Sequence, residues 1–127
     1  MRDPVWLIKA AVCAFHDEQV AEHGGQPGLR DDGLLDSALD RPKNRFHYGK
    51  RDIFDLAAAY AFGLAKNHPF LDGNKRASLV ACETFLKLNG EHLFASNEAV
   101  LATWVSLAGR TLSETEFAKW LGDNCAP

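Results

Sequence analysis

Apolar side chains recur along this chain at the spacing of α-helices, and no segment alternates apolar and polar residues as a half-buried strand does. Residues 52–66 are apolar on nearly every side, which is typical of a helix buried in the middle of a bundle. Residues 77–88, 100–108 and 117–121 gather their apolar side chains on one side. The pattern predicts an all-α fold, a single domain over residues 1–127 with about six helices.

Capping signals set the expected ends of the first two helices. Asp3 and Pro4 are the residue types favoured at an N-cap and at the first helical position, so the first helix is expected to run from there to about His23. Asp32 is expected to cap a short second helix, which ends near Pro42 because proline disrupts a helix interior.

Other signals place the later boundaries. Residues 43–51 are polar and basic, and they are expected to form a connection. Residues 89–90, Asn-Gly, match a left-handed C-terminal cap. Residues 96–97, Ser-Asn, are expected to begin the fifth helix, and Ser113 with Glu116 forms a capping box for the last one.

Composition narrows the class of protein. The chain has 127 residues, of which 46% are hydrophobic and 24% charged, as in one globular domain. Its net charge of −3 gives no field that would gather nucleic acid. No apolar run approaches the roughly 20 residues that span a membrane, and the N-terminus lacks the features of a signal peptide. Cys13, Cys82 and Cys125 form no CxxC pair, which favours reduced thiols and a cytoplasmic location.

The stretch HPFLDGNKR at residues 68–76 carries the candidate chemistry. Gly49-Lys50 is not part of a Walker phosphate loop, because arginine follows it where serine or threonine is needed. The stretch at residues 68–76 has a different pattern. It is not an EF-hand, because Ala77 stands where the loop needs its glycine. The histidines show no zinc-ligand spacing, and the chain has no GxSxG nucleophile elbow.

The same stretch predicts an anion site. Gly73 and Asn74 form a sharp turn that leads into a helix, whose free N–H groups and dipole favour a negative ligand. Lys75 and Arg76 lie at the positive end of that helix, where cations are unfavourable unless an anion such as phosphate neutralises them.

Two further residues complete a phosphoryl-transfer or nucleotidyl-transfer site. Asp72 could hold Mg²⁺, which needs few protein carboxylates when phosphate and water fill its octahedron. His68 is a candidate general base, because histidine titrates near neutral pH. An ordinary helix connection would explain any one of these residues alone, but it gives no reason for paired cations at a helix start.

Residues 68–76 resemble the signature of the Fic/Doc superfamily, whose Fic branch reads HPFx[D/E]GN-G-R. Residues 15–39 and 60–70 also resemble the Doc, or death-on-curing, toxins of toxin–antitoxin systems. Two positions depart from the Fic branch. Lys75 replaces its second glycine, and Leu79 stands where a second arginine is frequent.

The resemblance implies a Doc-type kinase that moves the γ-phosphate of ATP to a threonine of elongation factor Tu and arrests translation. His68 would be the base and Asp72 the Mg²⁺ ligand. The nucleotide phosphates would be bound by four residues, Gly73, Asn74, Lys75 and Arg76. A cognate antitoxin would cover the site.

Two alternatives stay open at this stage. An adenylyltransferase of the Fic type would move AMP from ATP to a protein hydroxyl, and a silent helical module would only bind an antitoxin-like peptide.

Four more predictions concern neighbouring residues. His16 is expected to be a hydrogen-bonded structural histidine, Phe70 to anchor the motif in the core, and the three tryptophans to be core residues. The basic stretch with Lys43, Arg45, Lys50 and Arg51 is expected either to cover the cleft as a flap that docks the target or to be a solvated loop.

Overall fold

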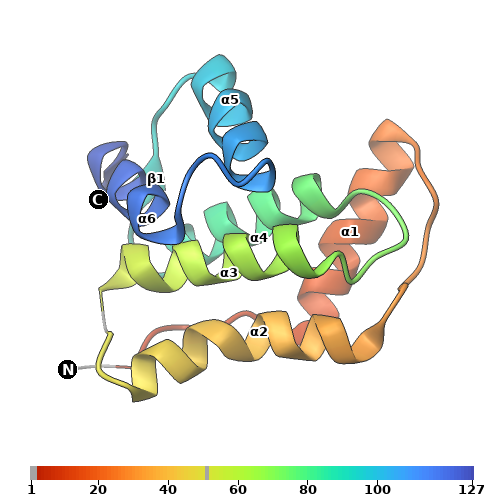
Figure 1. The fold of residues 1–127 in the computed structure, drawn as a ribbon, viewed down its shortest axis with the longest axis horizontal. Coiled ribbons are helices and arrows are strands. Elements are labelled where there is room, and N and C mark those ends of the chain that lie inside the picture. Colours follow the sequence, from red (N-terminus) through yellow and green to blue (C-terminus); the bar gives the residue numbers. More distant parts are fainter. Residues whose placement is uncertain (1–2, 51) are drawn as a thin grey trace.

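A computed structural model describes residues 3–50 and 52–127. Helices dominate the described residues, which confirms the predicted all-α bundle of six helices (Figure 1). The helices are α1 (Lys9–His23), α2 (Asp32–His47), α3 (Ile53–Asn67), α4 (Asn74–Leu88), α5 (Asn97–Ala108) and α6 (Glu114–Asp123).

Helix α3 is the centre of the bundle, as its apolar sequence predicts. It contacts α2, α4, α5 and α6, and in Figure 1 α2 lies below it and α4 behind it. Gly63 allows α2 to come close, because a Cβ there would lie 3.3 Å from the Cα of Ala38. Burial on nearly every side explains why this helix has so few polar residues.

Local capping signals predicted three boundaries correctly. Ser96 caps α5, and the capping box of Ser113 at the start of α6 is present. Gly90, which follows α4, has the expected positive φ of 88°. A cap that was not predicted is Asp52, whose side chain accepts a hydrogen bond from the N–H of Phe54 at the start of α3.

The predicted start of the first helix is wrong. Residues 3–8 are not helical, and α1 begins only at Lys9. The segment before it is held in place by long-range contacts. The N–H of Val5 donates to the Asn89 side chain at 2.8 Å, and the N–H of Leu7 donates to the hydroxyl of Tyr60 at 3.1 Å. These tertiary bonds outweigh the weak local preference of Asp-Pro for a helix start.

The second helix was also mispredicted. Asp31, not Asp32, is its N-cap, and the helix continues through Pro42. Residues 43–47 are therefore helical, and the connection to α3 begins only at Tyr48. The buried side chain of Phe46 and the contacts of Arg45 with α6 anchor the extra turn, and they outweigh the hydrogen bond that proline removes.

A short antiparallel ribbon is the other departure from the prediction. Strand β1 (His92–Leu93) pairs with β2 (Cys125–Ala126), so the chain end is tied beside the end of α4. Two-residue strands give no readable alternation, which explains why the sequence pattern missed them.

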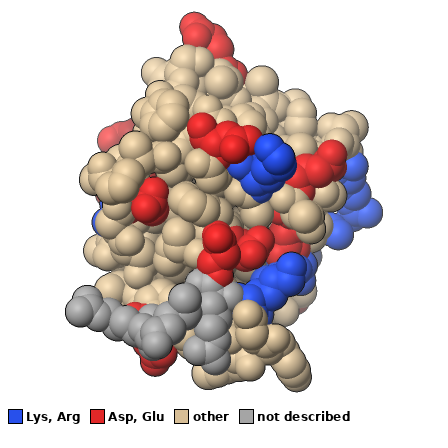
Figure 2. Space-filling model, turned by 90° about the vertical axis from the view of Figure 1, so that its left-hand side faces the viewer, with Lys and Arg blue, Asp and Glu red and all other residues tan. Residues whose placement is uncertain are grey.

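None of the helices in the described residues combines the length and apolarity needed to cross a bilayer. Acidic and basic side chains are interspersed on the face drawn in Figure 2.

Candidate active site

The predicted motif lies in the loop between α3 and α4 and in the first turn of α4. His68 ends α3 in the left-handed conformation, with φ 48° and ψ 55°, which is uncommon for a residue with a side chain. Gly73, with φ 75°, is the N-cap of α4. The six residues between the helices therefore turn twice through left-handed backbone, and this places the side chain of His68 on the rim of a cavity.

Asn74 holds the turn. Its Oδ1 accepts from the N–H of Phe70 at 3.0 Å, and its Nδ2 donates to the carbonyl of Phe70 at 3.1 Å. Both polar atoms of the amide side chain are thus engaged within the loop. The backbone N–H group of Asn74 is among the donors at the start of α4.

The first turn of α4 is open to a ligand. No side chain caps it, and it contains no acidic residue. The N–H groups of residues 74–76 precede the first helical hydrogen bond, which Ala77 makes to the carbonyl of Gly73 at 3.0 Å. Lys75 and Arg76 are exposed and make no ion pair within the described ranges. These donors and cations together fit an anion such as phosphate.

Asp72 keeps its carboxylate at the surface of the loop. Oδ1 accepts from the N–H of Gly73 at 2.8 Å, and Oδ2 faces the N–H of Gln26 at 3.4 Å. No group of three or more histidine, cysteine, aspartate or glutamate side chains among the described residues could hold a metal by itself. Asp72 therefore fits Mg²⁺ only as one carboxylate ligand beside phosphate and water, which is a usual arrangement for that ion.

His16 supports the loop from behind and confirms the prediction of a structural histidine. It is buried, its ring stacks on Phe70 with centroids 3.9 Å apart, and its Nε2–H donates to the carbonyl of Asp72 at 2.7 Å. Phe70 is 2% exposed, which confirms its role as the anchor of the motif.

Arg30 is a contributor that the sequence did not reveal. Its Nε donates to the carbonyl of His68 at 2.7 Å, and its Nη2 donates to the carbonyl of Asn67 at 2.8 Å. The backbone of Arg30 also donates to the carbonyl of Pro69, at 2.7 Å. Arg30 therefore satisfies the last carbonyls of α3 and supports the left-handed conformation of His68. No local pattern could signal a contact between residues so far apart in the chain.

The cavity beside these residues has a volume of about 500 Å³. Helix α5 supplies one of its walls, which is apolar and was not predicted. Leu101 and Val105 on this wall are each 61% exposed, whereas Trp104 is buried and donates to the hydroxyl of Ser78 at 3.0 Å. The full lining consists of His68, Leu71, Asp72, Gly73, Asn74, Lys75, Arg76, Leu79, Leu101, Trp104 and Val105. All six predicted site residues thus line one cavity.

The basic stretch behaves differently from its prediction. Lys43 and Arg45 belong to α2, Lys50 lies in the connection that follows, and Arg51 lies outside the described residues. Neither Arg45 nor Lys50 lines the cavity of the motif, so the described part of the stretch forms no flap over that cavity.

Comparison with known proteins agrees with the motif. Residues 6–86 match the model of the Fic/DOC family. The chain is similar to "Protein kinase doc" of Escherichia phage P1, with 36% identity over 86 residues, which cover 67% of this chain and 68% of the phage protein. It is also similar to "Toxin Doc" of Mycolicibacterium smegmatis, with 43% identity over 76 residues, 57% of each chain. The chain therefore belongs to the Fic/DOC family, in its Doc branch.

Proposed function

We propose that this protein is a Doc-type toxin that transfers the γ-phosphate of ATP to a protein hydroxyl. The observation that carries the proposal is the start of α4, where uncapped N–H groups lie beside the unpaired side chains of Lys75 and Arg76. The similarity to the phage relative, which is named a protein kinase, supports the same reaction class.

Each residue of the loop would have a separate task. The N–H groups at the start of α4, with Lys75 and Arg76, bind phosphate and stabilise charge that develops during transfer. His68 accepts the proton of the attacking hydroxyl. The hydroxyl oxygen bonds to the γ-phosphorus, the bond between that phosphorus and the β–γ bridging oxygen breaks, and ADP leaves with the electron pair. Mg²⁺ bound at Asp72 would supply positive charge beside the phosphates.

Lys75 favours phosphate transfer over AMP transfer. In the Fic branch that this motif resembles, glycine occupies this position and lets a nucleotide phosphate reach the backbone. A lysine side chain fills that space and adds a charge. Since Lys75 is exposed and unpaired in the described chain, it is free to contact the γ-phosphate.

Two partners belong to the proposal. A threonine of elongation factor Tu is the acceptor that the family resemblance implies, and its modification would arrest translation. A cognate antitoxin would cover the cavity, for which the exposed apolar side chains of Leu101 and Val105 offer a contact surface.

The test is a transfer experiment with purified protein, Mg²⁺, elongation factor Tu and ATP labelled at either the α- or the γ-phosphate. We expect label only from the γ position and none with His68→Ala. Label from the α position would show an adenylyltransferase. Absence of transfer to any protein, in the purified assay and in whole-cell lysate, would contradict the enzyme and leave a silent binding module.

Lys75→Gly provides the matched variant for nucleotide orientation. If Lys75 selects the γ-phosphate, this variant loses γ transfer and gains α transfer. Unchanged γ transfer in Lys75→Gly would show that this residue does not decide the reaction.

A further inference from the structure

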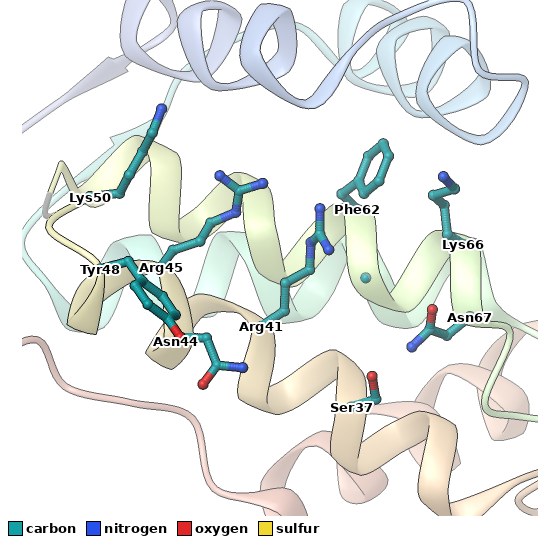
Figure 3. Close-up of a pocket in the computed structure, with 10 residues that line it drawn as sticks. Ser37, Arg41, Asn44, Arg45, Tyr48, Lys50, Phe62, Lys66 and Asn67 are labelled. Atoms are coloured by element: carbon teal, nitrogen blue, oxygen red, sulfur yellow. The ribbon is translucent and has the colours of Figure 1, made fainter.

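A second cavity lies on the side of α2 and α3, apart from the one beside the motif (Figure 3). It has a volume of about 590 Å³. We call it the basic groove; it is lined by Ser37, Arg41, Asn44, Arg45, Tyr48, Lys50, Phe62, Gly63, Lys66 and Asn67. None of these residues lines the cavity of the proposed reaction.

The groove is positively charged although the chain as a whole is negative. Figure 3 shows the side chains of Lys50, Arg45, Arg41 and Lys66 in a row, all pointing to the same side of the two helices. Glu114 of α6 pairs with Arg41 and, at 2.8 Å, with Arg45, so it neutralises one of the four charges. Lys50 and Lys66 have no carboxylate partner in the described ranges. The groove therefore keeps a surplus of positive charge.

Aromatic rings and ion pairs hold part of this row in place. The Arg41 guanidinium lies 5.2 Å, and the Lys66 ammonium 4.6 Å, from the centre of the Phe62 ring. These contacts limit the freedom of both cations before any ligand arrives, so binding costs less conformational entropy. Tyr48, at the other end, is 89% exposed and can pack against an arriving chain.

The size of the groove suits a short peptide. Its lining extends from Ser37 on α2 to Tyr48, the residue that follows this helix, a length of about 16 Å at the helical rise of about 1.5 Å per residue. An extended peptide rises about 3.3 Å per residue, so about five residues fit. A polynucleotide would need a longer basic track to gain from several phosphate contacts, and the net charge of −3 opposes it.

The groove leads to the proposed active site. Lys66 and Asn67 form its end on α3, and the next residue, His68, lines the cavity beside the motif. The Asn67 side chain donates to the carbonyl of Leu34 at 3.0 Å, which joins α2 and α3 at this point. A chain lying in the groove would thus continue toward the proposed base.

We propose that the basic groove binds an acidic segment, about five residues long, of the protein that receives the phosphoryl group. This inference rests on the proposed function, and it assigns the substrate a chemical feature: Asp and Glu residues close in sequence to the modified hydroxyl. The groove would raise affinity for the protein substrate without touching the reacting atoms.

A binding experiment tests the groove independently of catalysis. The probe is a fluorescein-labelled peptide of five glutamates, and its control is the same peptide with five glutamines; anisotropy is measured at low and high salt. We expect binding of the glutamate peptide only, weakened by salt. Lys50→Glu should weaken it by about tenfold, since it replaces an attraction with a repulsion. Lys87→Glu, an equal charge change on α4, should leave it unchanged.

Three results would overturn the groove as an acidic-peptide site. They are equal binding of both peptides, no effect of salt, and equal loss in Lys50→Glu and Lys87→Glu. Arg41→Gln is a second variant, in which Arg45 still pairs with Glu114, so the fold is not left with a lone carboxylate. Its expected loss is about fivefold.

A kinetic experiment tests the docking role. With the protein substrate, Lys50→Glu should raise KM for the protein by about tenfold and leave KM for ATP and kcat unchanged, and the glutamate peptide should compete with the protein substrate. A peptide that binds without competing would assign the groove to another partner and refute the proposal. Transfer without peptide binding would refute the docking role alone. Peptide binding with no transfer to any protein would refute the proposed function, and the docking role with it.

Discussion

Arg30 offers the sharpest test of how the scaffold positions the proposed base. Its two hydrogen bonds to the carbonyls of Asn67 and His68, 2.8 and 2.7 Å long, support a left-handed residue that carries a side chain. Such a conformation costs about 1–2 kcal/mol. Two exposed hydrogen bonds, worth about 0.5–1.5 kcal/mol each, are enough to offset that cost.

Arg30→Ala removes both bonds and leaves the cost of the left-handed turn uncompensated. If restoring the left-handed conformation of His68 then costs about 1.4 kcal/mol, the fraction of molecules with a correctly placed His68 falls about tenfold, and kcat falls with it. Arg30→Lys should recover part of the rate, because lysine donates from one point and cannot span both carbonyls as the guanidinium does. The assay is γ-label transfer under saturating ATP, with the His68 ring proton resonance recorded by NMR as a second measurement.

The control for this variant is Lys87→Ala, which removes an exposed cation far from the loop. We expect it to keep full activity. Arg30→Ala should shift the His68 resonance and lower kcat while the melting temperature changes by only a few degrees. Full activity and an unmoved His68 resonance in Arg30→Ala would refute the positioning role.

Three further predictions follow from the same structure. Gly73→Ala forces a left-handed φ on alanine and should cost about 1–2 kcal/mol of folding free energy. The control is Gly49→Ala, at a position whose φ is also positive; it should lower the melting temperature similarly but keep transfer activity. Equal transfer activity in the two variants would contradict the site's need for Gly73. EDTA should abolish transfer, and Asp72→Asn should raise the Mg²⁺ concentration needed, whereas transfer without metal would contradict the role of Asp72. Burial raises the pKa of Tyr60 from 10 to about 12, so the Tyr60 hydroxyl loses its proton at a lower pH in the unfolded state than in the folded state. Stability should therefore fall between about pH 10 and 12, by roughly 2–3 kcal/mol, and urea titrations of Tyr60→Phe should show a weaker fall.

The candidate site divides into a local part and a long-range part. Nine consecutive residues were enough to propose roles for Asp72, Gly73, Lys75 and Arg76, because a turn that leads into a helix start creates an anion site by itself. The support of the loop could not be assigned, since Arg30 and His16 reach it from distant segments. Asn74 was assigned, with Gly73, to the turn that leads into the helix, and its side chain holds that turn through two hydrogen bonds to Phe70.

The basic groove depends on tertiary structure in the same way. Its cations come from α2, the following connection and α3, and the carboxylate that neutralises part of their charge comes from α6. The sequence showed only a basic stretch. The extension of α2 through Pro42, which burial of Phe46 and the pairing with Glu114 stabilise, turned that stretch into one side of a groove.

By itself, the sequence determined the features that short-range physics controls: the helical class, the buried central helix, two side-chain caps and the candidate anion site at residues 68–76. These depend on spacing within a few turns of chain, where apolar periodicity and capping bonds act. Tertiary structure decided the extended segment before Lys9, the length of α2, the apolar wall of α5 and the two cavities. Each of these arises from contacts between residues far apart in the chain, and such contacts can outweigh a local preference of about 1 kcal/mol.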